Sequence, residues 1–130
     1  MKKYEVEKIR NVALVGHGGS GKTSLGEALL FDAGVTTRLG RVDEGTSVLN
    51  FEPEEKSHRL TISTSLALAE YKNHKLNLLD TPGYDVFLYD AQACLPAVDA
   101  AVLVAAPEEG IKVETEKLWN SCEELGLPRV

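Results

Sequence analysis

The stretch from Gly16 to Thr23 constrains this chain more than any other part of it. Its letters, GHGGSGKT, fit the pattern of glycine, four residues, glycine, lysine and serine or threonine. Glycines carry no Cβ, so such a loop can turn sharply and direct several backbone N–H groups at phosphate oxygens. An apolar run (12–15) precedes the loop and a helical pattern follows it as far as Gly34, which is the required context. The pattern therefore predicts a nucleotide site.

The individual loop residues have chemical reasons to bind a nucleotide. A helix that begins near Gly21 adds the positive end of its dipole. The Lys22 ammonium suits the outer phosphates, and the Thr23 hydroxyl can bind Mg²⁺. The predicted nucleotide-binding set, which includes two residues of a second motif, is His17, Gly18, Gly19, Ser20, Gly21, Lys22, Thr23, Ser24, Asp80 and Gly83.

The second motif, Asp80-Thr81-Pro82-Gly83, follows an apolar run at residues 76–79. An aspartate at the end of a buried strand near a phosphate loop can hold a Mg²⁺-bound water, and the N–H of Gly83 can turn toward a terminal phosphate. Taken alone, the same letters are an ordinary exit from a strand into a turn. Their position after a phosphate loop, with a strand leading in, favours the functional interpretation.

The rest of the chain alternates strands with helices. We expect strands at 11–15, 61–71, 76–79 and 100–106, and helices at 22–33, 85–95 and 112–125. A polar turn makes the second and third strands a hairpin, whereas residues 35–59 are expected to lack regular structure. Cys94, Cys122 and Trp119 are interpreted as core residues. The pattern predicts an α/β P-loop NTPase fold, a doubly wound and mostly parallel sheet with one antiparallel strand.

Composition excludes several classes of function. A hydrophobic content of 43% in 130 residues suffices for one globular domain. With 20 acidic and 14 basic residues the net charge is −6, so direct binding of nucleic acid is not expected. No run of about 18 apolar residues could span a membrane. The basic start lacks the apolar centre of a signal peptide, which predicts a cytoplasmic protein.

Together these motifs resemble the translational GTPases, and within them elongation factor G, above all its divergent second type. The resemblance extends from Ile9 to Val130. The matching features are the histidine-containing phosphate loop, Glu44-Gly45, Thr61, the motif at Asp80, and Gly110 followed by Glu114-Thr115-Glu116 and Trp119. The resemblance implies GTP and GDP as ligands, and Mg²⁺ held by Thr23, Thr61 and Asp80. It also implies that the full-length protein works on the ribosome, where GTP hydrolysis drives movement of tRNA and mRNA.

The resemblance further implies two switches. Residues 35–59 look like the first switch, with Thr61 closing over Mg²⁺ and the terminal phosphate, and residues 80–87 look like the second. Both would become disordered after hydrolysis. The implied catalytic residues are Lys22, Thr61, Gly83 and Tyr84, with Tyr84 placing the attacking water.

Four departures from the family pattern bear on the activity. Tyr84 stands where the family has its catalytic histidine, and a tyrosine with a pKa of about 10 cannot exchange protons at neutral pH as imidazole does. Gly19 and Asn50 each replace an aspartate. Residues 58–60, His-Arg-Leu, replace the usual arginine-glycine before the threonine. We therefore expect hydrolysis to be slow or differently triggered, with His17 orienting the loop and His58 simply solvated.

The end of the chain leaves base recognition open. Residues 127–130 are expected to begin the next strand, before the Asn-Lys-x-Asp motif by which GTPases recognise guanine. We therefore expect residues 1–130 to be the N-terminal part of a GTP-binding domain, with strand 100–106 as an exposed apolar edge. Two alternatives stay open. One is a binding module that signals by nucleotide occupancy with little hydrolysis, and the other is a phosphate-loop ATPase or kinase of another class.

Overall fold

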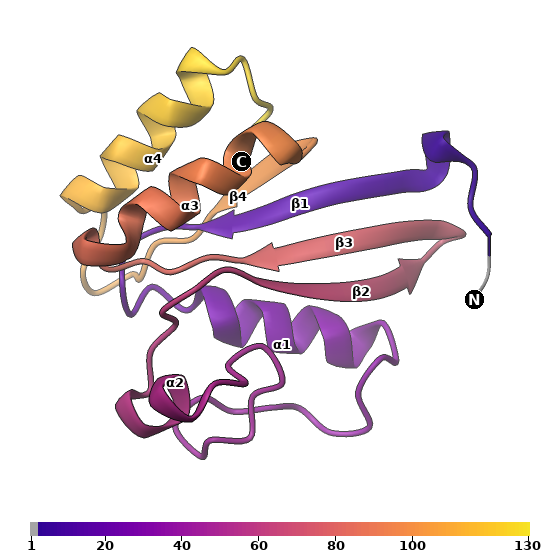
Figure 1. The fold of residues 1–130 in the computed structure, drawn as a ribbon, viewed down its shortest axis with the longest axis horizontal. Coiled ribbons are helices and arrows are strands. Elements are labelled where there is room, and N and C mark those ends of the chain that lie inside the picture. Colours follow the sequence, from indigo (N-terminus) through magenta and orange to yellow (C-terminus); the bar gives the residue numbers. More distant parts are fainter. Residues whose placement is uncertain (1–2) are drawn as a thin grey trace.

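A four-stranded sheet forms the centre of the computed structural model, which describes residues 3–130 (Figure 1). The strands are β1 (Ile9–Val15), β2 (Ser65–Tyr71), β3 (His74–Asp80) and β4 (Ala100–Leu103), in the spatial order β2-β3-β1-β4. β1 pairs in parallel with both β3 and β4, and β2 pairs antiparallel with β3. The predicted mostly parallel α/β sheet with one antiparallel strand is confirmed.

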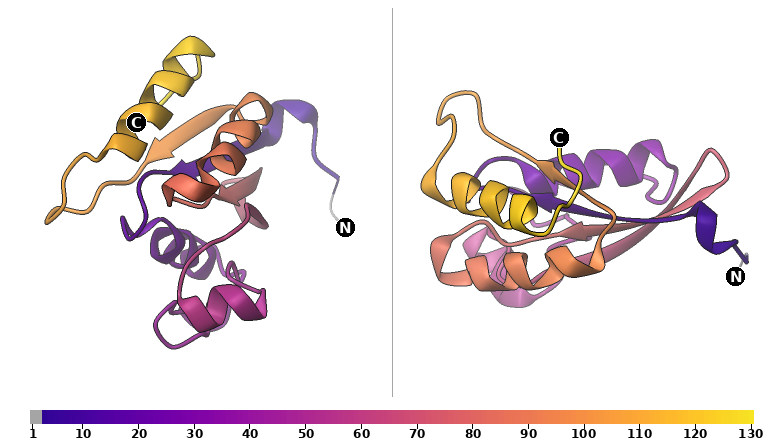
Figure 2. Two further views of the ribbon diagram at one scale, coloured as in Figure 1. Left: turned by 60° about the vertical axis from the view of Figure 1, so that its left-hand side comes forward. Right: turned by 90° about the horizontal axis from the view of Figure 1, so that it is seen from above.

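Helices cover both faces of this sheet. They are α1 (Lys22–Asp32), α2 (Pro53–His58), α3 (Leu88–Cys94) and α4 (Val113–Glu124), with short 3-10 turns at Val6–Lys8, Asp85–Phe87 and Leu95–Ala97. α1 lies on one face, and α3 and α4 lie on the other (Figures 1 and 2). No helix within residues 3–130 combines the length and the apolar content that crossing a membrane requires.

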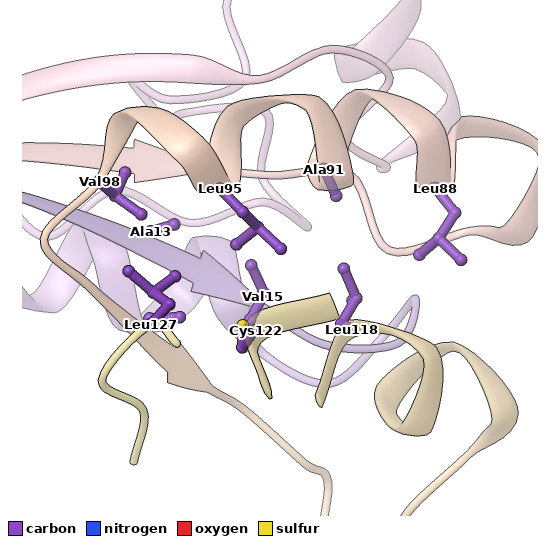
Figure 3. Close-up of a cluster of buried hydrophobic side chains, with 10 residues drawn as sticks. Ala13, Val15, Leu88, Ala91, Leu95, Val98, Leu118, Cys122 and Leu127 are labelled. Atoms are coloured by element: carbon purple, nitrogen blue, oxygen red, sulfur yellow. The ribbon is translucent and has the colours of Figure 1, made fainter. Parts of the chain in front are cut away.

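The main hydrophobic core lies between the sheet and the pair α3 and α4 (Figure 3). Its buried members are Ala13, Val15, Leu88, Ala91, Leu95, Val98, Ala101, Leu118, Cys122 and Leu127. A smaller cluster of Leu30, Leu49 and Ala69 lies under α1 on the opposite face. Because both faces are covered, the end of β1 is buried on each side, as is typical of a central parallel strand.

Residues 35–59 are more regular than the sequence analysis expected. α2 lies within this segment, and the prediction that the whole segment lacks regular structure is therefore wrong. Pro53 occupies the first turn, where its missing N–H costs nothing, and the Glu55 carboxylate accepts a hydrogen bond of 3.3 Å from the N–H of Glu52. Glutamate in place of the usual serine, threonine or aspartate at the start of the helix conceals this signal in the sequence.

The outer edge of β4 is covered, so the expected exposed apolar edge is also wrong. The N–H of Ala101 donates to the carbonyl of Pro128 (2.9 Å), and the N–H of Leu103 donates to the carbonyl of Val130 (2.7 Å). Ala101 and Arg129 form an isolated parallel bridge. The last three residues therefore pair with the edge of β4 by backbone hydrogen bonds.

Several predicted element boundaries differ from those of the structure, and β4 ends at Leu103 rather than at residue 106. β2 begins at Ser65 rather than at residue 61. The Asp90 carboxylate accepts from both the N–H (2.6 Å) and the hydroxyl (2.7 Å) of Thr64, which holds that residue away from the strand. The predicted helix 85–95 begins as a 3-10 turn, and the 3-10 turn at its end runs through Pro96.

Trp119 is not a core residue, contrary to the sequence interpretation. It is 44% exposed, and its ring stacks with the guanidinium of Arg129 at 4.2 Å from the ring centroid. Its neighbour Leu118 is fully buried. Of the two cysteines, which are both free thiols, Cys122 is fully buried and Cys94 is half-buried against the core.

Adjacent substitutions on α4 test this arrangement. Leu118→Ala is expected to lower the free energy of unfolding by about 2 to 5 kcal/mol, because it leaves a cavity in the core. Trp119→Ala is expected to cost only about 1 kcal/mol, mainly the exposed stacking with Arg129. Urea unfolding followed by circular dichroism measures both. Equal losses for the two variants would contradict the burial described here.

Candidate nucleotide site

A pocket of about 200 Å³ lies where the two predicted motifs meet the segment 35–61. It is lined by Gly18, Gly19, Gly21, Lys22, Thr23, Ser24, Val42, Asp43, Asn50, Arg59, Leu60, Thr61, Gly83 and Tyr84. Of the predicted site residues, only His17, Ser20 and Asp80 do not line it, and all three are buried. The fold thus brings the predicted set together, as expected at the carboxyl ends of strands in an open α/β sheet.

The phosphate loop has the backbone that its glycines predict. Gly16, Gly19 and Gly21 have φ values of 146°, 80° and 96°, a region that favours glycine. Within residues 3–130, the N–H groups of Gly18, Gly19 and Gly21 make no hydrogen bond to a backbone carbonyl. These donors, at the start of α1, fit the phosphate groups of a nucleotide.

Lys22 is the first residue of α1 and is 6% exposed. Its Nζ donates to the carbonyl of His17 at 2.7 Å and lies 3.4 Å from the Ser20 hydroxyl. Burial lowers the pKa of Lys22 to about 8, and the negative charge of Asp80 opposes this shift. The ammonium therefore sits inside the loop, at the position from which it can reach phosphate oxygens.

Three oxygen-bearing side chains converge beside the loop. The Thr23 hydroxyl donates to Asp80 Oδ2 at 2.7 Å and lies 3.0 Å from the Thr61 hydroxyl. The Thr61 hydroxyl also contacts Asn50 Oδ1 at 3.0 Å. These residues come from α1, from the end of β3 and from the segment before β2, so only the tertiary fold unites them.

The side chains of the same cluster are suited to binding Mg²⁺. Its donors are all oxygens, which Mg²⁺ prefers, and Asp80 Oδ1 is buried without a hydrogen-bond partner. Burial raises the pKa of Asp80 to about 6, although the hydrogen bond from Thr23 and the charge of Lys22 oppose the shift. A hard cation would supply the missing partner of this carboxylate.

Gly83 and Tyr84 pack closely against the phosphate loop. A Cβ on Gly83 would lie 2.6 Å from the carbonyl carbon and oxygen of His17, so no larger residue fits there. A Cβ on Gly18 would lie 2.7 to 2.9 Å from three atoms of the Tyr84 ring. Gly18 does not have a positive φ. The Tyr84 ring, and not the backbone, therefore leaves room only for a glycine at position 18 as long as the ring packs there.

His17 points away from the pocket. Its Nδ1 lies 3.1 Å from the Thr115 hydroxyl of α4, and its Nε2 lies 3.5 Å from a carboxylate oxygen of Glu109. Burial and the charges of Lys112 and Lys22 lower the pKa of His17, against the opposing effect of Glu109. His17 therefore joins the phosphate loop to α4. His58 is exposed at the end of α2, as the sequence predicted.

Sequence reasoning missed several lining residues. Asn50, which the sequence marks only as a departure from the family pattern, lines the pocket and contacts Thr61. Arg59, which follows α2, has left-handed backbone angles (φ 56°, ψ 40°). That conformation costs a non-glycine residue roughly 1 kcal/mol. Val42 and Asp43 line the pocket too, and their letters carry no signal.

Comparison with known proteins defines the class. The elongation factor Tu GTP-binding domain family matches residues 7–130. The chain belongs to this family, and the resemblance to elongation factor G is confirmed by its relatives.

One relative is an elongation factor G-like protein of Mycobacterium tuberculosis, 44% identical over 121 residues. Another is elongation factor G 1 of Geobacter sulfurreducens, 31% identical over 130 residues. These matches cover 93% and 100% of the chain but only 17% and 19% of the relatives. A crystal structure from Thermus thermophilus is 48% identical with a TM-score of 0.90, over 95% of this chain and 19% of that one. The chain thus spans about a fifth or less of these proteins.

The packing of Tyr84 on Gly18 can be tested by substitution. Gly18→Ala is expected to push the Tyr84 ring toward solvent, because the added methyl group occupies the place of the ring edge. The free energy of unfolding should change by less than about 1 kcal/mol, since the half-exposed ring can swing away. NMR spectra of labelled tyrosine rings should show a shift of the Tyr84 signals. In a Tyr84→Ala background, Gly18→Ala should leave the amide signals of the loop in place.

Proposed function

We propose that this chain forms the phosphate-binding and switch part of a GTPase that acts in translation. The observation that carries the proposal is the convergence of Thr23, Thr61 and Asp80 beside the glycine loop and Lys22. Family membership supports guanine nucleotide as the ligand. In the full-length protein, the same site would hydrolyse GTP and couple hydrolysis to the ribosome in the cytoplasm.

The proposed binding roles follow from the positions of the groups. Backbone N–H groups of the loop and the Lys22 ammonium would hold the phosphates. The hydroxyls of Thr23 and Thr61 would hold Mg²⁺, with Asp80 binding it directly or through water. When bound, Mg²⁺ supplies charge neutralisation at the phosphate oxygens.

The proposed hydrolysis depends on positioning rather than on a base. The N–H of Gly83 would donate to the terminal phosphate, and the Tyr84 hydroxyl would orient the attacking water. The Tyr84 ring packs against Gly18 at the rim of the pocket and the residue is 45% exposed, so its hydroxyl is accessible to water there. Because a tyrosine does not exchange protons readily at neutral pH, slow intrinsic turnover is expected.

Ribosome-stimulated turnover tests the proposal. The full-length protein should hydrolyse GTP, and not ATP, faster when ribosomes are added. Tyr84→Phe should lower the stimulated rate by about tenfold, the effect of losing one hydrogen bond in the transition state. Tyr84→His should restore or raise it. Absence of any stimulation would refute the translational role, and unchanged rates in both variants would refute a role for this position.

A second candidate function is a nucleotide-occupancy module with little hydrolysis. The observation that favours it is Tyr84 itself, which occupies the position of the family's base without its proton chemistry. In that case, GTP and GDP would change ribosome binding in the wild type, while Tyr84→Phe and Tyr84→His would leave the slow rate unchanged. A phosphate-loop ATPase or kinase of another class is disfavoured by the family match.

Asp80→Asn tests the metal site. The amide oxygen can still accept from Thr23, but the negative charge is lost, so Mg²⁺ should raise GTP affinity at least about tenfold less than in the wild type. Titration calorimetry with GTP, with and without Mg²⁺, measures this. Asp32→Asn, at the exposed end of α1, is the charge-matched control and should behave as the wild type. An equal Mg²⁺ effect in Asp80→Asn would contradict the proposed ligand set.

A further inference from the structure

Glu27 is a fully buried carboxylate on α1 that the proposed chemistry does not use. Its Oε1 accepts three hydrogen bonds, from the hydroxyl of Ser47 (2.6 Å) and from the N–H groups of Val48 (2.7 Å) and Leu49 (3.0 Å). All three donors are uncharged and come from consecutive residues of the first-switch segment. One carboxylate oxygen thus holds this stretch of loop against the helix.

The surrounding packing is shaped for the same contact. Leu49 is 2% exposed, and a Cβ on Gly26 would lie 2.6 Å from its Cδ1 atom. Gly40 lies so close to Glu27 Oε2 that an added Cβ would overlap that atom. Two glycines, one on α1 and one on the loop, therefore leave room for the loop to lie directly on the helix. Neither Gly26 nor Gly40 has a positive φ, so the backbone does not demand glycine at either position.

A chain of hydrogen bonds leads from this contact to the oxygen cluster. The Ser47 hydroxyl, bound to Glu27, accepts from the N–H of Asn50 at 3.1 Å. Asn50 in turn contacts the Thr61 hydroxyl, which lies 3.0 Å from that of Thr23. Glu27 is therefore connected to the proposed metal site through the loop, although it does not line the pocket.

We propose that Glu27 is a positioning residue, which anchors residues 47–49 to α1 so that Asn50 can hold Thr61 at the nucleotide site. The part of this inference that concerns nucleotide rests on the proposed function, whereas the anchor itself does not. The anchored stretch divides the first-switch segment. Residues 47–49 stay attached to the helix, so movement on hydrolysis falls in the parts of the segment on either side of them.

Hydrogen exchange tests the anchor independently of any nucleotide. In the full-length protein, the amides of Val48 and Leu49 should exchange at least about tenfold faster in Glu27→Leu, which keeps the volume but removes the acceptor. Glu27→Gln retains an acceptor oxygen and should restore most of the protection. Glu54→Gln, at an exposed position of α2, is the charge-matched control and should match the wild type. Unchanged exchange in Glu27→Leu would overturn the proposal.

Nucleotide affinities test the positioning role. Thr61 is proposed to meet the metal and the terminal phosphate, so Glu27→Leu should weaken binding of a non-hydrolysable GTP analogue by about tenfold and leave GDP binding within about twofold. Equal weakening of both nucleotides would reduce Glu27 to a structural role and overturn the inference. If neither the wild type nor any variant binds guanine nucleotide, the proposed function is refuted. The hydrogen-exchange measurement still tests the anchor in that case.

Gly26→Ala tests the anchor independently, because helix propensity and the proposed loop contact predict opposite effects. Alanine favours a helix over glycine by about 1 kcal/mol, so a loop that does not rest on α1 would leave the variant more stable. The inference expects instead that the methyl group displaces Leu49, speeds exchange at residues 48 and 49, and lowers analogue affinity as Glu27→Leu does. Faster exchange supports the anchor, and a more stable variant with unchanged exchange overturns it.

Discussion

The parallel pairing of β1 with β3 is the constraint on which the rest of this structure depends. It places Leu14 opposite Asp80, and the N–H and hydroxyl of Thr81 both donate to the Leu14 carbonyl, at 3.3 and 2.7 Å. Two motifs that are far apart in the sequence thereby leave the sheet side by side. The contact of Asp80 with Thr23 follows from this register, because the loop after β1 leads directly into α1.

Burial of charge is the second consequence of that arrangement. Lys22 and Asp80 are both almost fully buried. The loss of surrounding water lowers the pKa of Lys22 and raises that of Asp80, so each shift favours the neutral form. Such groups destabilise a fold unless a partner compensates them, and buried groups with shifted pKa values gather at functional sites. Asp80 has one buried oxygen without a partner. The unfavourable free energy at this site thus comes from desolvated charges, for which a bound nucleotide and metal would provide partners.

Local sequence patterns predicted the sheet, the phosphate loop and the second motif, because each depends on neighbours in the chain. The predictions failed mainly where contacts between residues distant in the sequence determine the structure. Trp119 follows the apolar stripe of α4 but stacks with Arg129 at the surface. α2 escapes prediction for a local reason, because a glutamate at its N-cap position hides the capping signal. Glu27 looks like any solvated helical residue, since its three donors lie about twenty positions further on. Only the folded loop reveals it.

The fit of the Tyr84 ring over Gly18 constrains how such a site can arise by mutation. A ring at position 84 lies against the phosphate loop only when position 18 has no Cβ. The constraint acts in one direction only. A side chain at position 18 would displace the ring, whereas a smaller residue at position 84 would leave Gly18 in place. Glycine at position 18 is thus compatible with several residues at position 84, while a tyrosine packed in this place is compatible only with glycine at position 18.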